Sequence, residues 1–247
     1  MSVKLLLDLG NTRLKAWRVR LVDGEPPAWL DRVVLDAALT DFNADALPLE
    51  GVEEMVLSAV GRRDWRHQLA LVAERRGIEL RELSVQRQGI EHCYERVESL
   101  GVDRWLGLLA ARRHVQGASL VVDAGTAVTL DVLDAEGRHG GGMIVPGVRT
   151  MRRSLHEGTA DLPVVDGWSV ALGSATEAAI AAGTLRAVVA LVESVYREQL
   201  DMRGVLTLVL SGGDGEAVYN ALTVPARLEV DWVAEGMLQA LSLSESE

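Results

Sequence analysis

Two stretches of the chain share one pattern of apolar and polar positions. Each consists of a short apolar run, an Asp-x-Gly turn and a second apolar run that returns. The first stretch is Leu5–Val19, with its turn at Asp8-Leu9-Gly10, and the second is Leu120–Leu133, with its turn at Asp123-Ala124-Gly125. Short apolar runs are typical of buried β-strands, and a Gly in the turn lets backbone amides face a ligand. The pattern predicts two β-hairpins at equivalent places in two similar halves.

The rest of the chain predicts strands first and then strands alternating with helices, which indicates an α/β fold with helices packed on a mixed sheet. The expected strands are Val3–Leu9, Arg13–Arg20, Trp29–Leu35, Glu54–Val60, Ile78–Leu83, one that begins at Leu120, Val128–Leu133 and Val205–Leu210. The expected helices are a segment after Leu35 that runs through Ala46, Arg63–Arg76 with its C-cap at Gly77, Asp103–Val115, one after Gly147 that runs through His156, Ser174–Leu200 and Trp232–Leu243. The run Gly140–Gly142 is consistent with a flexible connector.

The length of 247 residues suits one large domain or two moderate ones, and the repeated hairpin favours two. We place the domains at residues 1–117 and 118–247. The hydrophobic share of 48% is sufficient for a sizeable core. Small residues in the expected helix Ser174–Leu200 would allow close helix packing or a contact between subunits.

The balance of charges argues against one class of partner. With 36 acidic and 25 basic residues, the formal net charge is −11, the wrong sign for tracking a phosphate backbone, so nucleic-acid binding is not expected. No apolar run approaches a membrane-spanning length, and Met1–Leu7 has no basic or cleavable part of a signal peptide. We therefore expect a cytoplasmic protein with no membrane partner.

Cys93 is the single cysteine, which excludes an intrachain disulfide and suits a reducing cytosol. It lies between His92 and Tyr94, but neighbouring residues of an extended chain point to opposite sides, so a thiol nucleophile is not expected. The histidines have no metal-ligand spacing, and we assign them no chemistry.

An Asp-x-Gly turn after a strand is, taken singly, most often structural. Two such turns in equivalent settings, with a third glycine cluster at Gly212-Gly213, favour a phosphate or nucleotide site. Asp103-Arg104 follows Gly101 at an expected helix start, where an Asp is usually a cap. The same pair could also supply a general base and a clamp for a carboxylate.

Five motifs in chain order resemble those of type III pantothenate kinases, which belong to the acetate and sugar kinase, Hsp70 and actin superfamily. The motifs are Asp8-Leu9-Gly10-Asn11-Thr12-Arg13-Leu14-Lys15, Tyr94 with Gly101-Val102-Asp103-Arg104-Trp105, Asp123-Ala124-Gly125-Thr126-Ala127, Gly141-Gly142-Met143-Ile144-Val145-Pro146-Gly147 and Thr176-Glu177-Ala178-Ala179-Ile180-Ala181-Ala182-Gly183. One motif would be weak, but the ordered set spans nearly the whole chain and is specific. The resemblance implies two similar ribonuclease H-like, or actin-like ATPase, domains.

The resemblance also implies ATP-dependent phosphorylation of pantothenate to 4'-phosphopantothenate, the first step of coenzyme A biosynthesis. The residues implied to bind ATP are Asp8, Leu9, Gly10, Asn11, Thr12, Arg13, Leu14, Lys15 and Thr126. Those implied to bind pantothenate are Tyr94, Gly101, Val102, Asp103, Arg104 and Thr176. Within these sets Asp103 is the catalytic proton acceptor, Arg104 faces the pantothenate carboxylate, and Thr176 reaches substrate across a homodimer interface. The implied cofactors are Mg²⁺ with ATP, positioned by Asp8, and a monovalent cation, K⁺ or NH₄⁺, held by Asp123.

The chain departs from the family pattern at Val97, where relatives commonly have Pro, so the loop before Gly101 need not follow the family shape. Two other function classes remain open. Another small-molecule kinase or a polyphosphate hydrolase of the superfamily would share the Asp-x-Gly turns but would not require Tyr94 and Asp103-Arg104 at this spacing. A non-catalytic transcription accessory protein could keep the fold and lose turnover, although the intact acidic residues of the motifs argue against such decay.

Overall fold

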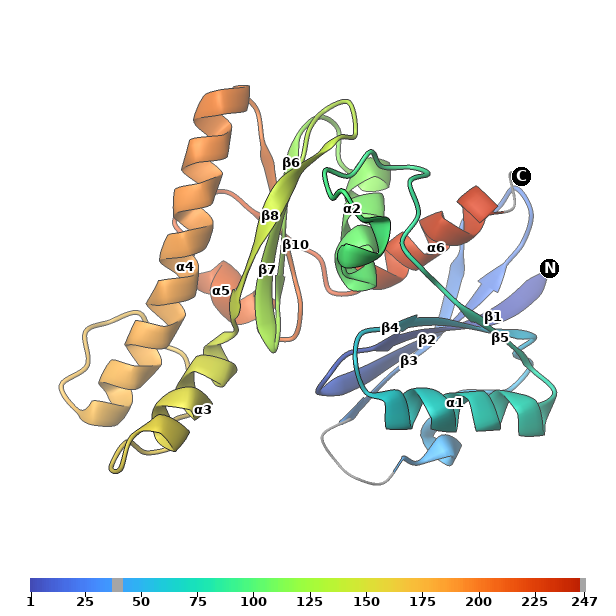
Figure 1. Ribbon diagram of the computed structural model, residues 1–247, viewed down its shortest axis with the longest axis horizontal. Helices are drawn as coiled ribbons and strands as arrows, with labels where there is room; N and C mark the ends of the chain where they lie inside the picture. Colours follow the sequence, from blue (N-terminus) through green and yellow to red (C-terminus); the bar gives the residue numbers. More distant parts are fainter. Residues whose placement is uncertain (37–41, 245–247) are drawn as a thin grey trace. The chain divides into compact units, whose positions relative to one another are not determined.

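The computed structural model describes residues 1–36 and 42–244. Within them the chain forms two compact units, each with a five-stranded mixed β-sheet (Figure 1). Unit 1 contains Met1–Gln88, Tyr94–Ala110 and the chain from Val233 on, and unit 2 contains Gly89–Cys93 and Ala111–Trp232. The expected division at residues 117 and 118 separates the two sheets, but the compact units are not continuous in sequence.

The first sheet has the strand order β3-β2-β1-β4-β5. Strand β2 runs antiparallel to both β1 and β3, whereas β4 runs parallel to β1 and to β5. The strands are β1 (Ser2–Leu9), β2 (Arg13–Leu21), β3 (Ala28–Asp36), β4 (Glu54–Ala59) and β5 (Glu79–Glu82). The alternating and continuous apolar runs that predicted these strands fill the core of unit 1, where Leu5, Leu7 and Met55 are fully buried.

The second sheet has the order β10-β9-β6-β7-β8 and the same pairing scheme. Strand β7 runs antiparallel to β6 and β8, and β9 runs parallel to β6 and β10. The strands are β6 (Ser119–Ala124), β7 (Ala127–Leu133), β8 (His139–Pro146), β9 (Thr207–Ser211) and β10 (Arg227–Leu228). The predicted fold, two similar α/β halves each with a mixed sheet, is confirmed.

Helices cover the sheets in each unit (Figure 1). They are α1 (Arg63–Arg76), α2 (Val102–His114), α3 (Val148–Gly158), α4 (Thr176–Arg203), α5 (Gly215–Ala221) and α6 (Trp232–Ser244), with 3₁₀ turns at Ala44–Ala46 and Val97–Ser99. Helix α1 packs Trp65, Leu69 and Ala73, spaced by four residues, on the first sheet. It ends at Gly77, which has the left-handed conformation of a C-cap as predicted.

Helix α6 joins unit 1 although it follows the second sheet in sequence. Its Gly236 lies against the backbone of α2, because a Cβ on this residue would be 2.0 Å from the carbonyl oxygen of Leu106. The two backbones can approach this closely only because Gly236 has no side chain. Sequence periodicity gives no information on such a partner, which is why a single domain boundary was expected.

Helix α4 corrects the expectation that no segment is long and apolar enough to span a membrane. Thr176–Arg203 meets that condition by length and composition. However, 56% of its most apolar window is buried inside the structure, where Leu185, Val188 and Val192 pack on the second sheet. The helix is therefore built as the core helix of a globular unit.

Other parts of the chain differ from the sequence interpretation or were not predicted. The run Gly140–Gly142 forms part of strand β8: Gly142 pairs with Asp131 of β7, and the register shifts before His139 pairs with Leu133. The short elements α5 and β10 were not predicted, since neither is long enough to show a periodicity. The helical segment expected after Leu35 falls partly outside the described residues, and its described end is the 3₁₀ turn Ala44–Ala46.

Candidate active site

Asp8 lies at the carboxyl end of β1, the central strand of the first sheet. It is in register with Lys15 on β2 and with Ser58 on β4. The Lys15 ammonium is 3.8 Å from a carboxylate oxygen of Asp8, and both side chains are largely buried. The strand pairing therefore places one carboxylate and one ammonium together beside the first turn, a pair that suits a magnesium nucleotide.

The turn between β1 and β2 exposes its polar residues Asn11, Thr12 and Arg13. It is closed by a hydrogen bond of 2.9 Å from the Gly10 N–H to the Arg13 carbonyl. Leu9 and Leu14, which the family resemblance included among the ATP-binding residues, are fully buried. Their side chains belong to the core, so only their backbone groups could contact a ligand.

Asp123 occupies the same place in the second sheet that Asp8 occupies in the first. It lies near the carboxyl end of β6 and is in register with Thr129 on β7 and Ser211 on β9. The Ser211 hydroxyl donates a hydrogen bond of 3.2 Å to the Asp123 carboxylate. Asp123 forms no ion pair with any residue in the described part of the chain. Its negative charge is thus only half buried and not neutralised by a neighbouring cation.

The turn after Asp123 is held by the start of α3. The Thr126 carbonyl accepts hydrogen bonds from the Gly147 N–H at 2.9 Å and from the Thr150 hydroxyl at 2.6 Å. Gly147 has no room for a side chain, because a Cβ would lie 1.9 Å from the carbonyl oxygen of Gly125. These contacts explain the Gly that ends the fourth motif. The Thr126 side chain itself remains exposed.

Tyr94 and Arg104 form a pair in unit 1. The Arg104 guanidinium donates a hydrogen bond of 2.9 Å to the Tyr94 hydroxyl and lies 5.7 Å from the centre of its ring. Arg104 is the third residue of α2, and it is 8% exposed. Tyr94 thus orients a guanidinium, whose N–H donors form a planar fork that matches the two oxygens of a carboxylate.

Asp103 is the second residue of α2, and its carboxylate accepts a hydrogen bond of 2.8 Å from the Arg104 backbone N–H. The preceding Gly101 makes room for this carboxylate, since a Cβ there would be 2.6 Å from the Asp103 oxygen. Val102, between them, is in the core. The Gly-Val-Asp-Arg motif thus fixes a half-buried carboxylate beside the Tyr94–Arg104 pair. Val97 begins a 3₁₀ turn in the loop before it.

The predicted residues fall into two groups. Unit 1 holds the first turn together with Tyr94 and the Gly101–Arg104 motif, and unit 2 holds Asp123, Thr126 and Thr176. Thr176 is the first residue of α4 and is exposed. No group of three or more His, Cys, Asp or Glu side chains in the described residues is arranged to hold a metal ion. A cation held here would have fewer than three such side chains of the described residues as ligands.

The structure adds residues that the sequence interpretation missed. Ser211 contacts Asp123, and Asp214, which is 5% exposed, accepts a hydrogen bond of 2.9 Å from Arg149. The Asp214 N–H also donates to the Ala124 carbonyl at 2.8 Å, so the glycine cluster packs on the second hairpin. Both residues flank the glycine cluster Gly212-Gly213, which the sequence did indicate. The pairing of β9 with β6, which brings this cluster to Asp123, could not be predicted from the sequence.

Comparison with known proteins gives consistent results. The family model described as type III pantothenate kinase matches residues 4–198. A type III pantothenate kinase of Nitrosococcus oceani is 35% identical over 88% of this chain and 86% of its own, and one of Aromatoleum aromaticum is 36% identical over 94% and 95%.

Solved structures with low identity share the fold. The structure described as a conserved putative Baf family transcriptional activator from Campylobacter jejuni has a TM-score of 0.63 at 20% identity, and the alignment covers 98% of this chain and 100% of that one. The activator of 2-hydroxyisocaproyl-CoA dehydratase from Clostridium difficile, solved with bound ADPNP, has a TM-score of 0.53 at 12% identity, covering 99% and 96%.

Proposed function

Since the chain belongs to the type III pantothenate kinase family, we propose that it transfers the γ-phosphoryl group of ATP to the hydroxyl group of pantothenate, the first step of coenzyme A biosynthesis. The observation that supports the acceptor is the pairing of Arg104 with Tyr94 beside Asp103.

Asp103 is the general base. In phosphoryl transfer the protein positions the reactants, stabilises the charge on the transferred group and accepts the proton of the attacking hydroxyl. A base for this step must be a carboxylate that a substrate can reach. Asp103 is half buried, and the Arg104 backbone N–H holds its carboxylate through a hydrogen bond of 2.8 Å. The partial positive charge at the start of α2 and the Arg104 N–H orient this carboxylate.

Arg104 binds the carboxylate of pantothenate. Its guanidinium is almost completely buried and is oriented by the Tyr94 hydroxyl, so little side-chain freedom is lost when an anion binds. The hydroxyl that is phosphorylated and the carboxylate lie at opposite ends of pantothenate. The acceptor site is completed by Gly101, Val102 and Thr176, through the shape of the backbone or through direct contact with pantothenate.

The first hairpin turn binds the phosphates of ATP. Its exposed hydroxyl, amide and guanidinium groups come from Asn11, Thr12 and Arg13, and Lys15 adds an ammonium beside Asp8. Asp8 would hold Mg²⁺, which usually takes one or two carboxylates and completes its shell with phosphate oxygens and water. The ion would offset charge on the phosphates. The exposed hydroxyl of Thr126 is a further phosphate ligand.

Asp123 would hold the monovalent cation, K⁺ or NH₄⁺. The fit rests on its half-buried carboxylate, which lacks an ion pair in the described residues and receives one hydroxyl from Ser211. A single carboxylate with neighbouring carbonyls and hydroxyls suits a weakly hydrated ion better than a divalent one. The positive charge of such an ion would offset the negative charge of Asp123.

The active form is a cytoplasmic homodimer. The segment before α4 exposes Val170 and Leu172, and Leu172 is 90% exposed, so an apolar surface lies next to Thr176. A two-fold interface is the commonest arrangement of soluble oligomers. Sedimentation at assay concentrations should give a dimer, and full activity of a monomer would contradict this assignment.

The function is tested with purified protein, ATP, Mg²⁺ and K⁺ in the presence of pantothenate. The expected result is equimolar ADP and phosphopantothenate, identified by mass spectrometry. Pantothenol has the same hydroxyl but an alcohol in place of the carboxylate, and it should be a much poorer acceptor. Turnover of sugars, acetate or polyphosphate in preference to pantothenate would overturn the proposal, as would the absence of any ATP-dependent product.

A further inference from the structure

A cysteine, a histidine and a carboxylate lie in line in unit 2, outside the residues assigned above. The Cys93 sulfur is 3.7 Å from Nδ1 of His139, and Nε2 of His139 is 2.8 Å from a carboxylate oxygen of Asp131. Cys93 is exposed, whereas the side chains of His139 and Asp131 are 0% and 3% exposed. The sequence drew attention to His92 as the neighbour of Cys93, but the partner of the thiol is a residue 46 positions away.

Backbone pairing fixes the place of Cys93. The His139 N–H donates to the Glu91 carbonyl at 2.8 Å, and the Glu91 N–H donates to the Gly137 carbonyl at 3.3 Å. Glu91 and Arg138 form a parallel bridge, so the chain that leads to Cys93 is attached to the start of β8. Cys93 then reaches Gly141, on which a Cβ would be 4.0 Å from the sulfur. The glycines of β8 have no side chains to cover the thiol.

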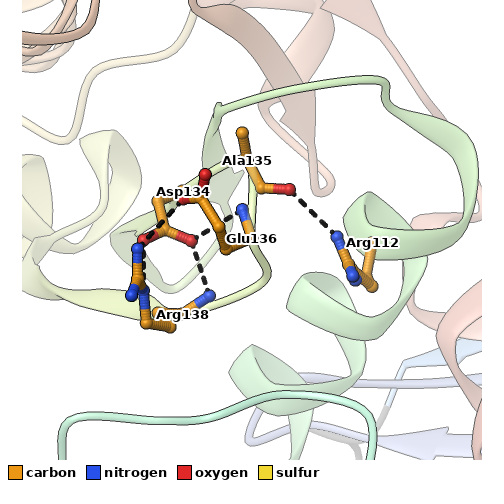
Figure 2. A network of polar contacts seen from close by, with 5 residues as sticks. All are labelled: Arg112, Asp134, Ala135, Glu136 and Arg138. Atoms are coloured by element: carbon orange, nitrogen blue, oxygen red, sulfur yellow. Dashed lines mark hydrogen bonds and ion pairs between the residues drawn. The ribbon is translucent and has the colours of Figure 1, made fainter.

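The hairpin turn that carries His139 is held by polar contacts on both sides (Figure 2). The Asp134 carboxylate accepts hydrogen bonds from the backbone of Glu136 at 3.0 Å and of Arg138 at 2.8 Å, and it forms an ion pair with the Arg138 side chain at 2.8 Å. Arg112 of α2 donates to the Ala135 carbonyl at 3.1 Å. Both the imidazole and the segment before Cys93 are therefore attached to a turn with many internal bonds.

The order of the three groups is that of an activated nucleophile. An ionised carboxylate only accepts hydrogen bonds, so Asp131 favours the tautomer of His139 that carries its proton on Nε2. The lone pair of Nδ1 then faces the Cys93 thiol and can accept its proton. A nucleophile next to a base that a third group orients is the arrangement by which proteins generate reactive thiolates. Within the described part of the chain, no group of three or more His, Cys, Asp or Glu side chains is arranged to hold a metal ion.

We propose that Cys93 is a modification site that reacts with small disulfides. In the reaction His139 accepts the thiol proton, and the Cys93 sulfur attacks one sulfur of a disulfide RSSR. The new Cys93–SR bond forms as the S–S bond breaks, and the departing thiolate RS⁻ takes the proton from His139 as RSH. Cys93 is oxidised and one half of the disulfide is reduced, so no other oxidant is needed. The disulfide RSSR that reacts with Cys93 is a low-molecular-weight compound such as oxidised glutathione.

The test uses the fact that Cys93 is the single cysteine, so all thiol chemistry of the chain reports on it. The folded protein is mixed with dithiodipyridine, and the released thiopyridone is followed by absorbance. The reference is the same chain unfolded in urea, in which Cys93 has no partner. We expect the folded protein to react about three- to tenfold faster at neutral pH, because Nδ1 of His139 lies 3.7 Å from the sulfur and can accept the thiol proton as the sulfur attacks.

Variants identify the base. His139→Gln should reduce the rate to that of the unfolded chain, whereas His67→Gln, on the exposed surface of α1, should leave it unchanged. Oxidised glutathione should add one glutathione per chain by intact mass, reversed by a reductant. A second measurement does not depend on the folding of the His139 variant: the wild type should take up one glutathione per chain, and Cys93→Ser should take up none. A folded thiol that reacts no faster than the unfolded one, or that takes up no glutathione, would overturn the proposal.

Discussion

Asp103 can be tested with little disturbance of the fold, because Asn has nearly the same shape and keeps an oxygen for the Arg104 N–H. In the structure this hydrogen bond is 2.8 Å long, and the neighbouring Gly101 leaves room for either side chain. Loss of a general base costs about 100- to 10,000-fold in rate, which corresponds to about 2.7–5.5 kcal/mol of activation free energy. Loss of a negative charge in the first turn of a helix costs only about 0.3–1 kcal/mol of stability. Loss of a general base would therefore lower kcat strongly, whereas loss of the charge at the helix start would lower the stability only slightly.

Asp64 provides a matched control for Asp103→Asn. It is the second residue of α1, as Asp103 is of α2, and it is exposed. Its ion pair with Arg62, at 2.8 Å, lies on the surface and contributes little. Asp64→Asn should lower stability only slightly, through the same loss of negative charge in the first turn of a helix, and leave kcat unchanged. A common loss of activity in both variants would point to a general effect of the substitution.

The assay measures kcat and both KM values by coupling ADP release to pyruvate kinase, and urea unfolding gives the stability of each variant. We expect Asp103→Asn to lose kcat with little change in the KM for ATP. If this variant turns over within a few-fold of the wild type, the carboxylate only accepts the helix N–H group, and the assignment of Asp103 as the base is wrong.

Four further predictions follow from the same contacts. Arg104→Lys should raise the KM for pantothenate about tenfold or more, because an ammonium cannot replace a planar fork, and leave the weak turnover of pantothenol unchanged. Gly147→Ala should destabilise the protein by about 1–3 kcal/mol, because its Cβ would overlap the Gly125 carbonyl at 1.9 Å, whereas Gly158→Ala, with nothing within 4 Å, should not. Thr129→Lys would copy into the second hairpin the ammonium that Lys15 provides in the first, so activity should no longer respond to potassium, while Thr129→Met should keep the response. Burial raises the pKa of Glu193, but hydrogen bonds from Thr223 and the charge of Arg197 outweigh burial and lower the pKa overall. The stability that this group contributes should therefore be lost as the pH falls through the lowered pKa. Glu193→Gln should cost about 1–3 kcal/mol near neutral pH, and urea titrations of this variant should lack the acid-dependent part of the stability.

The sequence predicted best those elements whose residues meet only near neighbours. The hairpin strands, α1 and its cap at Gly77 were all placed within one or two residues, because alternation, four-residue spacing and a left-handed Gly are local signals. The order of strands in each sheet was predicted only as far as the duplication implied it. What was missed depends on contacts between distant parts of the chain.

Two examples show this limit. Gly140–Gly142 looks like a connector because it has no side chains, but its backbone forms the edge of the second sheet next to β7. The sequence did not predict a partner for the Cys93 thiol, because neighbouring residues of an extended chain point to opposite sides, yet the sheet brings His139 to within 3.7 Å. Residue types and spacing along the chain carry no information on a pairing 46 residues apart.

The duplicated hairpins place the same carboxylate in two different electrostatic settings. Asp8 and Asp123 each precede the last residue of a central strand, and each is in register with a Ser on the parallel neighbour, Ser58 or Ser211. On the antiparallel neighbour the copies differ, because Lys15 faces Asp8 and Thr129 faces Asp123. A half-buried carboxylate without an ion pair has a solvation cost that a bound monovalent cation can offset, whereas Asp8 already has the Lys15 ammonium beside it. One change of residue on a repeated backbone therefore gives the two carboxylates different electrostatic surroundings, and this difference supports the proposal of a monovalent cation at Asp123 rather than at Asp8.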